Sequence, residues 1–374
     1  MTLRQLPLHA EGGLASSGRA SPEYVRISTA SAIALRLRSG RFARDFTFGG
    51  INVLLSYEDG CRSACAYCGL ARSRSGSYED KSFIRVGWPL VATDALVERL
   101  ARYEAGLTRV CVSMVTHPRA YHDTCEITGA ISERISTPVS VLVAPPTLKK
   151  DRLETLHALG VDMIGVGLDA VTEEVFRRTR NAVAGAGLRW EKYWQVLDDA
   201  REIFGPWKVN AHVVVGLGES DRELLSMVSR LTDRQVSSYL FCFNPEPGTP
   251  MARTPRPTLR RWRRLQLARH LVEAEGYELD QFAFAPDGEL VLVSAGERPL
   301  DEVVADGQVF MTNGCPGEGG APGCTRPYGS YGPREEFRDY PFPPAEDDLY
   351  EIHRQLGLGE IVGEADGEAD GEVN

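Results

Sequence analysis

The sequence predicts an α/β protein built as an incomplete (β/α)6 parallel barrel with a C-terminal extension. Six short runs rich in Val, Ile and Leu are each followed by a segment with helical periodicity. The runs are continuously apolar, which is typical of strands buried on both faces of a parallel sheet. A closed barrel needs eight such units, so six units predict a barrel that is open on one side. Functional residues are then expected at the carboxyl ends of the strands.

Each predicted strand lies directly before its helix, as in the crossover connections of parallel sheets. The predicted strands are residues 51–57, 108–115, 138–144, 161–170, 209–217 and 237–245. The predicted helices are residues 93–105, 125–135, 148–160, 173–180, 219–231 and 258–276. Leu96, Val97, Leu100 and Tyr103 fall on one face of the first helix, so this face is expected to pack on the sheet.

Four regions are expected along the chain. They are an N-terminal extension over residues 1–45, the barrel over 46–290, a C-terminal segment over 291–345 and a disordered acidic tail over 346–374. The tail contains ten acidic residues and one arginine, so it accounts for most of the net charge of −10. A short acidic repeat of this kind cannot bury a core of its own.

Composition indicates a cytoplasmic enzyme without a membrane or nucleic-acid partner. No apolar run approaches the length of a membrane span, and the first residues lack the pattern of a signal peptide. Eight cysteines in 374 residues are more typical of metal ligands and buried thiols than of a disulfide scaffold. The locally basic N-terminal segment matches no recognised nucleic-acid-binding motif.

Cys61, Cys65 and Cys68 follow the first predicted strand in a C-x3-C-x2-C spacing. Three thiolates can hold three irons of a [4Fe-4S] cube, which leaves the fourth iron open for a substrate or cosubstrate. The alternative is a zinc knuckle, but zinc favours four ligands in paired sets and no nearby residues complete such a set.

A second cysteine region lies in the C-terminal segment. Residues 311–333 contain Cys315 and Cys324 in a run dominated by Gly and Pro, which has few large apolar side chains. Metal ligation is therefore the expected source of order, and it suggests an auxiliary iron–sulfur cluster. Cys125 and Cys242 lie in apolar context and are expected to be buried thiols.

The first cysteine motif, with Tyr67 between its last two cysteines, resembles the radical S-adenosylmethionine (SAM) superfamily. The resemblance implies a [4Fe-4S] cluster whose open iron chelates SAM, and an aromatic residue, here Tyr67, that packs on the adenine. The segment VNAHVVVGLGES resembles the strand of this superfamily that meets the adenine. Gly216 and Glu219 match that element, whereas His212 stands where Gly is usual.

The segment GVGLDAVTEEVFRRTR is similar to the one in biotin synthase that binds SAM. The similarity implies that Asp169 contacts the ribose and Arg180 the SAM carboxylate. The alternatives are that Asp169 caps the next helix and that Arg180 is surface. Cys111 matches one auxiliary-cluster cysteine of biotin synthase, but Asn210 occupies another ligand position, so that [2Fe-2S] site is not preserved.

The elements GINVLLSYEDGC, AYCGLA, KSFIRVGWP and a C-terminal Cys, Cys, Arg-Pro-Tyr segment resemble the subunits of two-component lipoyl synthases over about residues 25 to 340. This chain has GEGGAPG inserted between its two C-terminal cysteines. The resemblance implies sulfur insertion, with Cys111, Cys315 and Cys324 as auxiliary-cluster ligands. Arg326 would be a cluster ligand or a positioning group, or else a surface residue.

Three functions stay open at this point. The first is a sulfur-inserting radical SAM enzyme, with an octanoylated carrier protein, a second radical SAM subunit and a reductant such as flavodoxin or ferredoxin as expected partners. The second is a radical SAM enzyme that rearranges or couples carbon skeletons without inserting sulfur. The third is a non-catalytic iron–sulfur or zinc scaffold protein.

Overall fold

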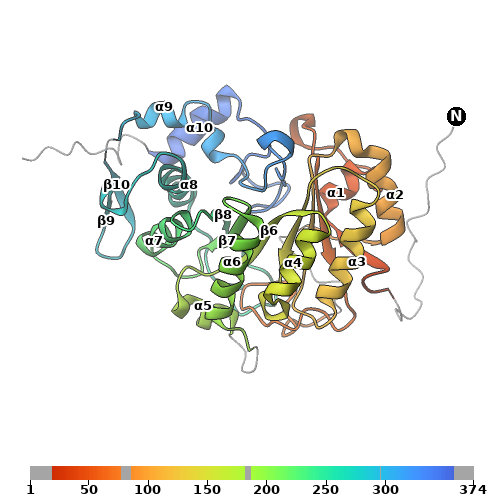
Figure 1. Cartoon of the computed structure of the whole chain (residues 1–374). Helices are drawn as coiled ribbons and strands as arrows, with labels where there is room; N and C mark the ends of the chain where they lie inside the picture. Colours follow the sequence, from red (N-terminus) through yellow and green to blue (C-terminus); the bar gives the residue numbers. More distant parts are fainter. Residues whose placement is uncertain (1–18, 77–85, 182–186, 295, 358–374) are drawn as a thin grey trace, which may run out of the picture.

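The computed structural model describes residues 19–76, 86–181, 187–294 and 296–357. Its centre is a mostly parallel sheet with the strand order β3-β1-β2-β4-β5-β6-β7-β8 (Figure 1). The six predicted parallel strands are confirmed, and together they form a partial barrel. They are β2 (Gly50–Leu55), β4 (Arg109–Ser113), β5 (Val139–Val143), β6 (Val161–Asp169), β7 (Val209–Val215) and β8 (Ser237–Cys242).

Helices cover the outside of this sheet (Figure 1). They are α2 (Thr93–Tyr103), α3 (Ala120–Ser132), α4 (Lys150–Ala158), α5 (Glu173–Arg180), α6 (Trp190–Phe204), α7 (Asp221–Thr232) and α8 (Leu259–Ala274). On α2, Leu96, Val97 and Leu100 of the predicted face are buried, and Tyr103 is partly buried. Two helices, α5 and α6, lie between β6 and β7, where the sequence pattern predicted one.

Two antiparallel strands extend the sheet beyond β2, one of them from the N-terminal region. β1 (Tyr24–Ile27) pairs antiparallel with β2, and β3 (Leu90–Ala92) pairs antiparallel with β1. A short helix, α1 (Thr29–Ala34), follows β1, and the Ser28 hydroxyl caps its amino end. Val25 and Ile27 are fully buried. The sequence pattern did not predict β1 because four residues are too short to show a periodicity.

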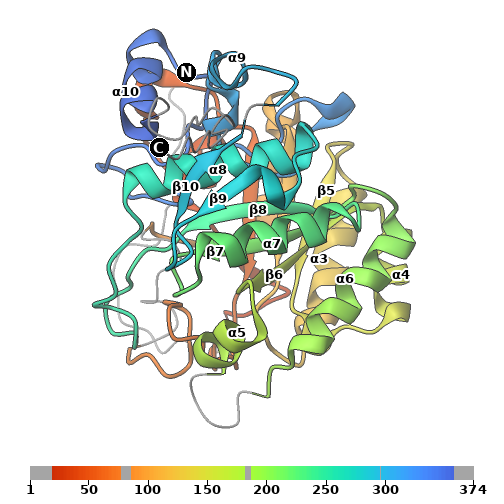
Figure 2. The same ribbon diagram turned by 90° about the vertical axis from the view of Figure 1, so that its left-hand side faces the viewer.

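The C-terminal region forms a second apolar core outside the barrel, and helices α7 and α8 contribute side chains to both cores. The hairpin of β9 (Phe282–Phe284) and β10 (Leu290–Val293) lies beside α7 and α8 (Figure 2). Two more helices follow, α9 (Leu300–Val304) and α10 (Glu346–Leu356). Short 3-10 helices are Ala43–Asp45, Glu104–Gly106, Pro145–Thr147, Leu279–Gln281, Gln308–Phe310 and Glu318–Gly320.

The prediction of a disordered tail from residue 346 is wrong over α10. Ile352 and Leu356 lie one turn apart and are fully buried against the second core. The carboxylate of Asp348 accepts a hydrogen bond from the backbone N–H of Ala345 at 2.9 Å, which satisfies an otherwise unpaired amide at the start of the helix. The rest of the predicted tail, residues 358–374, lies outside the described residues.

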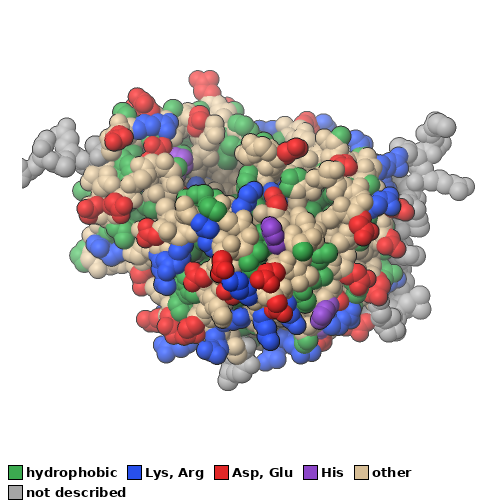
Figure 3. All heavy atoms as spheres, in the orientation of Figure 1, with side chains coloured by type: hydrophobic (Ala, Val, Ile, Leu, Met, Phe, Trp, Pro, Cys, Tyr) green, Lys and Arg blue, Asp and Glu red, His purple; other side chains and the backbone are tan. Residues whose placement is uncertain are grey.

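The surface carries both signs of charge. On the face in Figure 3, acidic and basic side chains are spread over the whole surface. No helix in the described ranges is long and apolar enough to cross a membrane.

Replacing Asp348 by Asn should destabilise the fold by about 1 kcal/mol at pH 7, because the neutral amide loses the ion pair with Arg44 and keeps one acceptor oxygen where the carboxylate has two. Burial alone would raise the pKa of Asp348, but the hydrogen bonds from Arg44 and Ala345 lower it. The stabilisation is therefore present above the ordinary carboxyl pKa and is lost as the pH falls through the lowered value. Denaturant unfolding of both proteins at pH 7 and pH 3 checks this; an equal difference at both pH values would contradict it.

Candidate active site

One cavity inside the partial barrel is lined by two groups of cysteines, and it encloses about 280 Å³. The first group is Cys61, Cys65 and Cys68, and the second is Cys111, Cys315 and Cys324. The inward side chains of the six parallel strands form the wall between them. Four of these cysteines lie in the first third of the chain and two lie in the C-terminal segment, and the fold brings all six to one cavity.

The first group lies on the loop that follows β2, at the carboxyl end of the parallel strands. Backbone hydrogen bonds hold this loop to the loop after β4 and to helix α5. Arg62 N–H donates to Thr116 O at 2.8 Å, and Ala66 N–H donates to Thr179 O at 2.7 Å. Burial raises the pKa of the Cys65 and Cys68 thiols. A cationic metal centre offsets that cost by stabilising the thiolates, so this donor set fits an iron–sulfur cluster.

Tyr67, Asp169 and Arg180 form a polar group beside these cysteines. The Tyr67 hydroxyl donates to Asp169 Oδ2, and Arg180 Nη1 lies 2.8 Å from the same oxygen. All three residues line the cavity. Arg180 is only 8% exposed, so the surface interpretation is wrong, and its buried Nε has no hydrogen-bond partner in the described chain.

The backbone turns Asp169 into the cavity. Its φ of +63° lies in the left-handed region, and the register of β6 against β7 shifts between Gly167 and Asp169. A non-glycine residue in this conformation carries strain of a kind found at functional sites. The helix-cap interpretation of Asp169 is wrong, because the Thr172 hydroxyl caps α5 by accepting from Val175 N–H at 3.2 Å.

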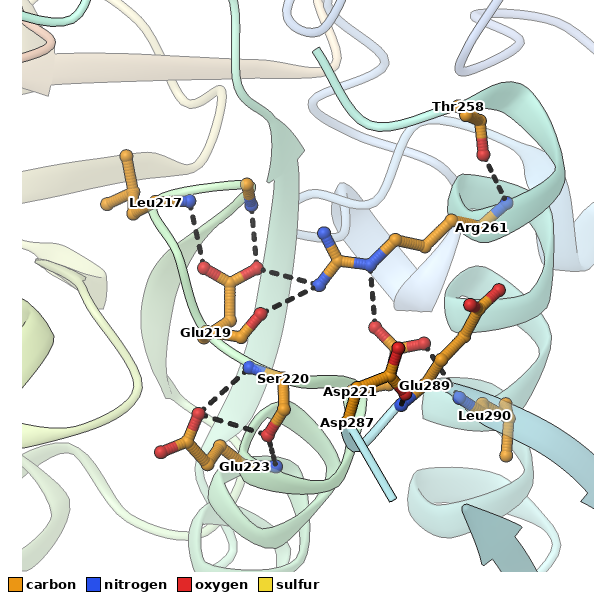
Figure 4. Close-up of polar contacts among 11 residues, drawn as sticks. Leu217, Glu219, Ser220, Asp221, Glu223, Thr258, Arg261, Asp287, Glu289 and Leu290 are labelled. Carbon is orange, nitrogen blue, oxygen red and sulfur yellow. Dashed lines mark hydrogen bonds and ion pairs between the residues drawn. The ribbon is translucent and has the colours of Figure 1, made fainter. Parts of the chain in front are cut away.

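Gly216 and Glu219 lie on the loop between β7 and α7, next to a separate cavity of about 810 Å³. Figure 4 shows that the Glu219 carboxylate on this loop points toward Arg261 on α8. The Glu219 carboxylate accepts hydrogen bonds from the backbone N–H groups of Gly216 at 2.7 Å and Leu217 at 2.8 Å. Arg261 lies 3.1 Å from the same carboxylate. Glu219 therefore shapes this turn, and its predicted place near adenosine stays a prediction.

The second cysteine group lies toward the amino end of the barrel. Cys111 is on β4, whereas Cys315 and Cys324 are on the C-terminal segment, which crosses between α8 and α1 in Figure 1. Thr108 Oγ1 donates to Gly323 O at 2.7 Å, and Arg109 Nε donates to Pro316 O at 2.5 Å. The C-terminal segment thus forms the floor of the cavity.

The three sulfur atoms of this group are electrostatic neighbours. Burial, followed by the charges of Cys111 and Cys324, raises the pKa of Cys315 to about 12. Burial and then Cys324 raise the pKa of Cys111. Such thiols become thiolates most readily when a metal compensates their charge.

Side-chain amides from opposite parts of the sheet point at two of these sulfurs. Asn52 Nδ2 donates to Cys324 Sγ at 3.7 Å, and Asn210 Nδ2 donates to Cys315 Sγ at 3.4 Å. Arg326 Nη1 lies 4.0 Å from Cys324 Sγ. Donors to sulfur stabilise thiolate ligands of iron–sulfur clusters, so the surroundings fit such a group. Sequence reasoning missed the role of Asn52, because only the fold brings it to Cys324.

The remaining cysteines differ from these six. Cys242 is buried and lines the cavity, where Arg338 Nη1 donates to its sulfur at 3.1 Å. Cys125 on α3 is only partly buried, against the expectation, and it lies beside Tyr121. Among the described residues, no group of three or more His, Cys, Asp and Glu side chains has the arrangement needed for a single metal ion.

Two glycines permit the floor segment to fold tightly around its cysteines. A Cβ atom at Gly314 would overlap the backbone of Cys324, and one at Gly323 would overlap the backbone of Cys315 and Gly317. Neither position can therefore hold a larger residue without moving the main chain.

Gly323→Ala should destabilise the protein by roughly 1–3 kcal/mol, because the overlap is with backbone atoms that cannot step aside. Gly106→Ala is the control, since a Cβ at Gly106 meets nothing within 4 Å. Denaturant unfolding of the two variants measures the difference. Equal stability would show that the floor segment is not packed as described.

The sequence model of the Radical SAM superfamily matches residues 55–231. Among solved structures, HydG, a maturase of the [FeFe]-hydrogenase, is 15% identical, with 72% of this chain and 56% of that chain covered and a TM-score of 0.46. This chain thus spans little more than half of the HydG chain. Methylornithine synthase (PylB) is 14% identical, with 89% of this chain and 88% of that chain covered and a TM-score of 0.47. Coproporphyrinogen III oxidase (HemN) from Escherichia coli, a radical SAM enzyme, is 18% identical over 44% of this chain and 40% of that chain, with a TM-score of 0.35. No curated protein sequence matches the chain significantly.

Proposed function

We propose, on the premise that residues 55–231 form a radical SAM domain, that this chain cleaves SAM and inserts sulfur at an unactivated C–H bond. The observation that supports sulfur insertion is the second cysteine group. Cys111, Cys315 and Cys324 line the same cavity as the cysteines of the radical SAM motif. A substrate held between the two groups would meet a hydrogen-abstracting radical on one side and a sulfur donor on the other.

The first cysteine group would hold the SAM-binding cluster. When bound, the reduced [4Fe-4S] cluster supplies the electron that splits SAM into methionine and a 5′-deoxyadenosyl radical. Cys61, Cys65 and Cys68 would each hold one iron. Asp169 and Arg180 would contact the ribose and the carboxylate of SAM. The Nε of Arg180, which has no hydrogen-bond partner in the described chain, is a donor suited to a carboxylate.

The second group would hold an auxiliary cluster as the sulfur source. Asn52 and Asn210 donate to two of its sulfur ligands and so favour their thiolate form. Apolar side chains from the strands, Leu54 and Leu142 among them, surround the space between the groups. Their role is to exclude water from a reactive radical.

The proposed activity is similar to that of lipoyl synthases. An octanoyl chain on a carrier protein is the proposed substrate, and its C–H bonds beyond the carbon next to the carbonyl are unactivated. A second radical SAM subunit and a reductant such as flavodoxin or ferredoxin are the proposed partners. No role for nucleic acid or a membrane is proposed.

Removing either cysteine group should separate the two activities. The Cys315→Ala, Cys324→Ala double variant should lose about one cluster of iron and form no sulfurated product, yet still release 5′-deoxyadenosine. The variant in which Cys61, Cys65 and Cys68 are all replaced by Ala should keep the iron of the auxiliary cluster and release no 5′-deoxyadenosine. Iron analysis, 5′-deoxyadenosine assay and mass measurement on an octanoylated carrier protein provide the readouts, with Cys125→Ala as the control.

Wild-type iron in the double variant would refute the auxiliary cluster. If the wild type also forms no sulfurated product, carbon-skeleton chemistry is the better proposal. Full SAM cleavage in the triple variant would instead refute the assignment of the first cluster.

Asp169→Asn should raise the dissociation constant for SAM about 10-fold to 100-fold, which corresponds to the loss of one charged hydrogen bond of roughly 1.5–3 kcal/mol. Thr172→Ala is the matched control on the same loop. It removes the cap of α5 and should lower stability by about 1 kcal/mol without changing SAM affinity. If both variants bind SAM like the wild type, Asp169 has no contact with SAM.

A further inference from the structure

The cavity wall is organised in layers, because alternate residues of each strand point inward. The floor layer contains Asn52, Cys111, Ser140 and Asn210, beside Cys315 and Cys324. Two residues farther along each strand lies a middle layer. Its members are Leu54, Ser113, Leu142, His212 and Phe241. Above it, Val214 and Phe243 continue toward the first cysteine group.

The middle layer is the space where a substrate would meet both cysteine groups. Two residues of a strand span about 6.5 Å along its axis. The middle layer is therefore about 6.5 Å from the floor layer and about 6.5 Å from the layer of Val214 and Phe243 above it. Leu54, Leu142 and Phe241 make most of this layer apolar. His212 is its one ionisable side chain, and Arg326 enters the same level from the C-terminal segment, with its guanidinium 4.0 Å from the centre of the Phe241 ring.

His212 presents an unused hydrogen-bonding group to this space. Its ring lies 4.9 Å from that of Phe241, and within the described ranges neither ring nitrogen has a hydrogen-bond partner. Burial, followed by the charge of Arg326, lowers the pKa of His212 to about 3. The imidazole is therefore neutral at ordinary pH, with one N–H donor available.

Arg326 presents a second unused donor and a positive charge. Its Nη1 is held by the Asn313 carbonyl oxygen at 3.2 Å, whereas its Nε is buried and has no partner in the described chain. Arg326 also forms no ion pair with any carboxylate that the structure describes. A buried donor without a partner is costly, and a guanidinium pairs best with a carboxylate or similar oxygen group.

We propose that His212 and Arg326 bind the oxygen atoms of a carboxylate or acyl carbonyl group at the end of an apolar substrate chain. Both residues contact the Phe241 ring, so the chain would extend from them along the apolar wall of Leu54 and Leu142. This inference rests on the proposed function for the place of the substrate, between the two cysteine groups. It adds which end of the substrate the chain recognises and with which atoms.

The test uses the full chain with its clusters reconstituted and three ligands of equal length: octanoate, octanamide and octylamine. Calorimetric titration should show that octanoate or octanamide binds, and that octylamine binds at least about tenfold more weakly. Octylamine lacks an oxygen acceptor, and its positive charge is repelled by that of Arg326. If octanoate binds best, the result indicates that the substrate is a free acid. If octanamide binds best, the result indicates that the substrate is an acyl group on a carrier. Binding of octylamine as tight as that of octanoate would overturn the proposal.

Three variants test the named residues. Arg326→Gln should weaken octanoate binding about tenfold and octanamide binding less, whereas His212→Phe should weaken both. Arg102→Gln, an exposed arginine on α2, is the control and should change neither. Unchanged octanoate and octanamide binding in both site variants would overturn the proposal.

Iron content and 5′-deoxyadenosine release, measured on the same samples, separate this inference from the proposed function. Loss of auxiliary iron in Arg326→Gln would assign Arg326 to the cluster and overturn its role in recognition. One outcome would uphold the inference and refute sulfur insertion. In it, the wild type binds the ligands that carry an oxygen acceptor, the site variants lose this binding, and the wild type forms no sulfurated product.

Discussion

The strand register of the parallel sheet is the constraint on which the site depends. Hydrogen bonding between neighbouring strands places Asn52 beside Cys111 and Cys111 beside Ser140, so these side chains reach one level of the cavity. A shift of one residue in any strand would turn its inward side chain outward. The positions of the floor, the middle layer and the cysteine loop therefore follow from one pattern of backbone pairing.

The floor segment depends on the sheet more than the sheet depends on it. The barrel has a large apolar core of its own, whereas the stretch around Cys315 and Cys324 is rich in Gly and Pro. Only a few polar contacts and close glycine packing fasten this stretch to the barrel. Ordering it costs conformational entropy that its own contacts repay poorly, so metal ligation is expected to supply part of its stability.

Much of the barrel could be predicted because its signal is local. Continuous apolar runs identify the six parallel strands, and the spacing of Cys61, Cys65 and Cys68 is visible without any fold. β1 is too short to carry a pattern. The contact of Asn52 with Cys324 joins residues 272 positions apart, so no local pattern reports it. The left-handed turn at Asp169 likewise depends on a register shift between two strands.

The α10 helix shows how composition misled the prediction for the tail. Its acidic residues resemble those of the segment after it, but Ile352 and Leu356 occur at helical spacing and meet an apolar face of α8. Burial of such side chains contributes about 1.5–3 kcal/mol each, which outweighs the weak intrinsic preference of the charged positions. Charge content alone therefore does not decide order, because a few apolar residues on one helix face are sufficient when the fold provides a matching surface.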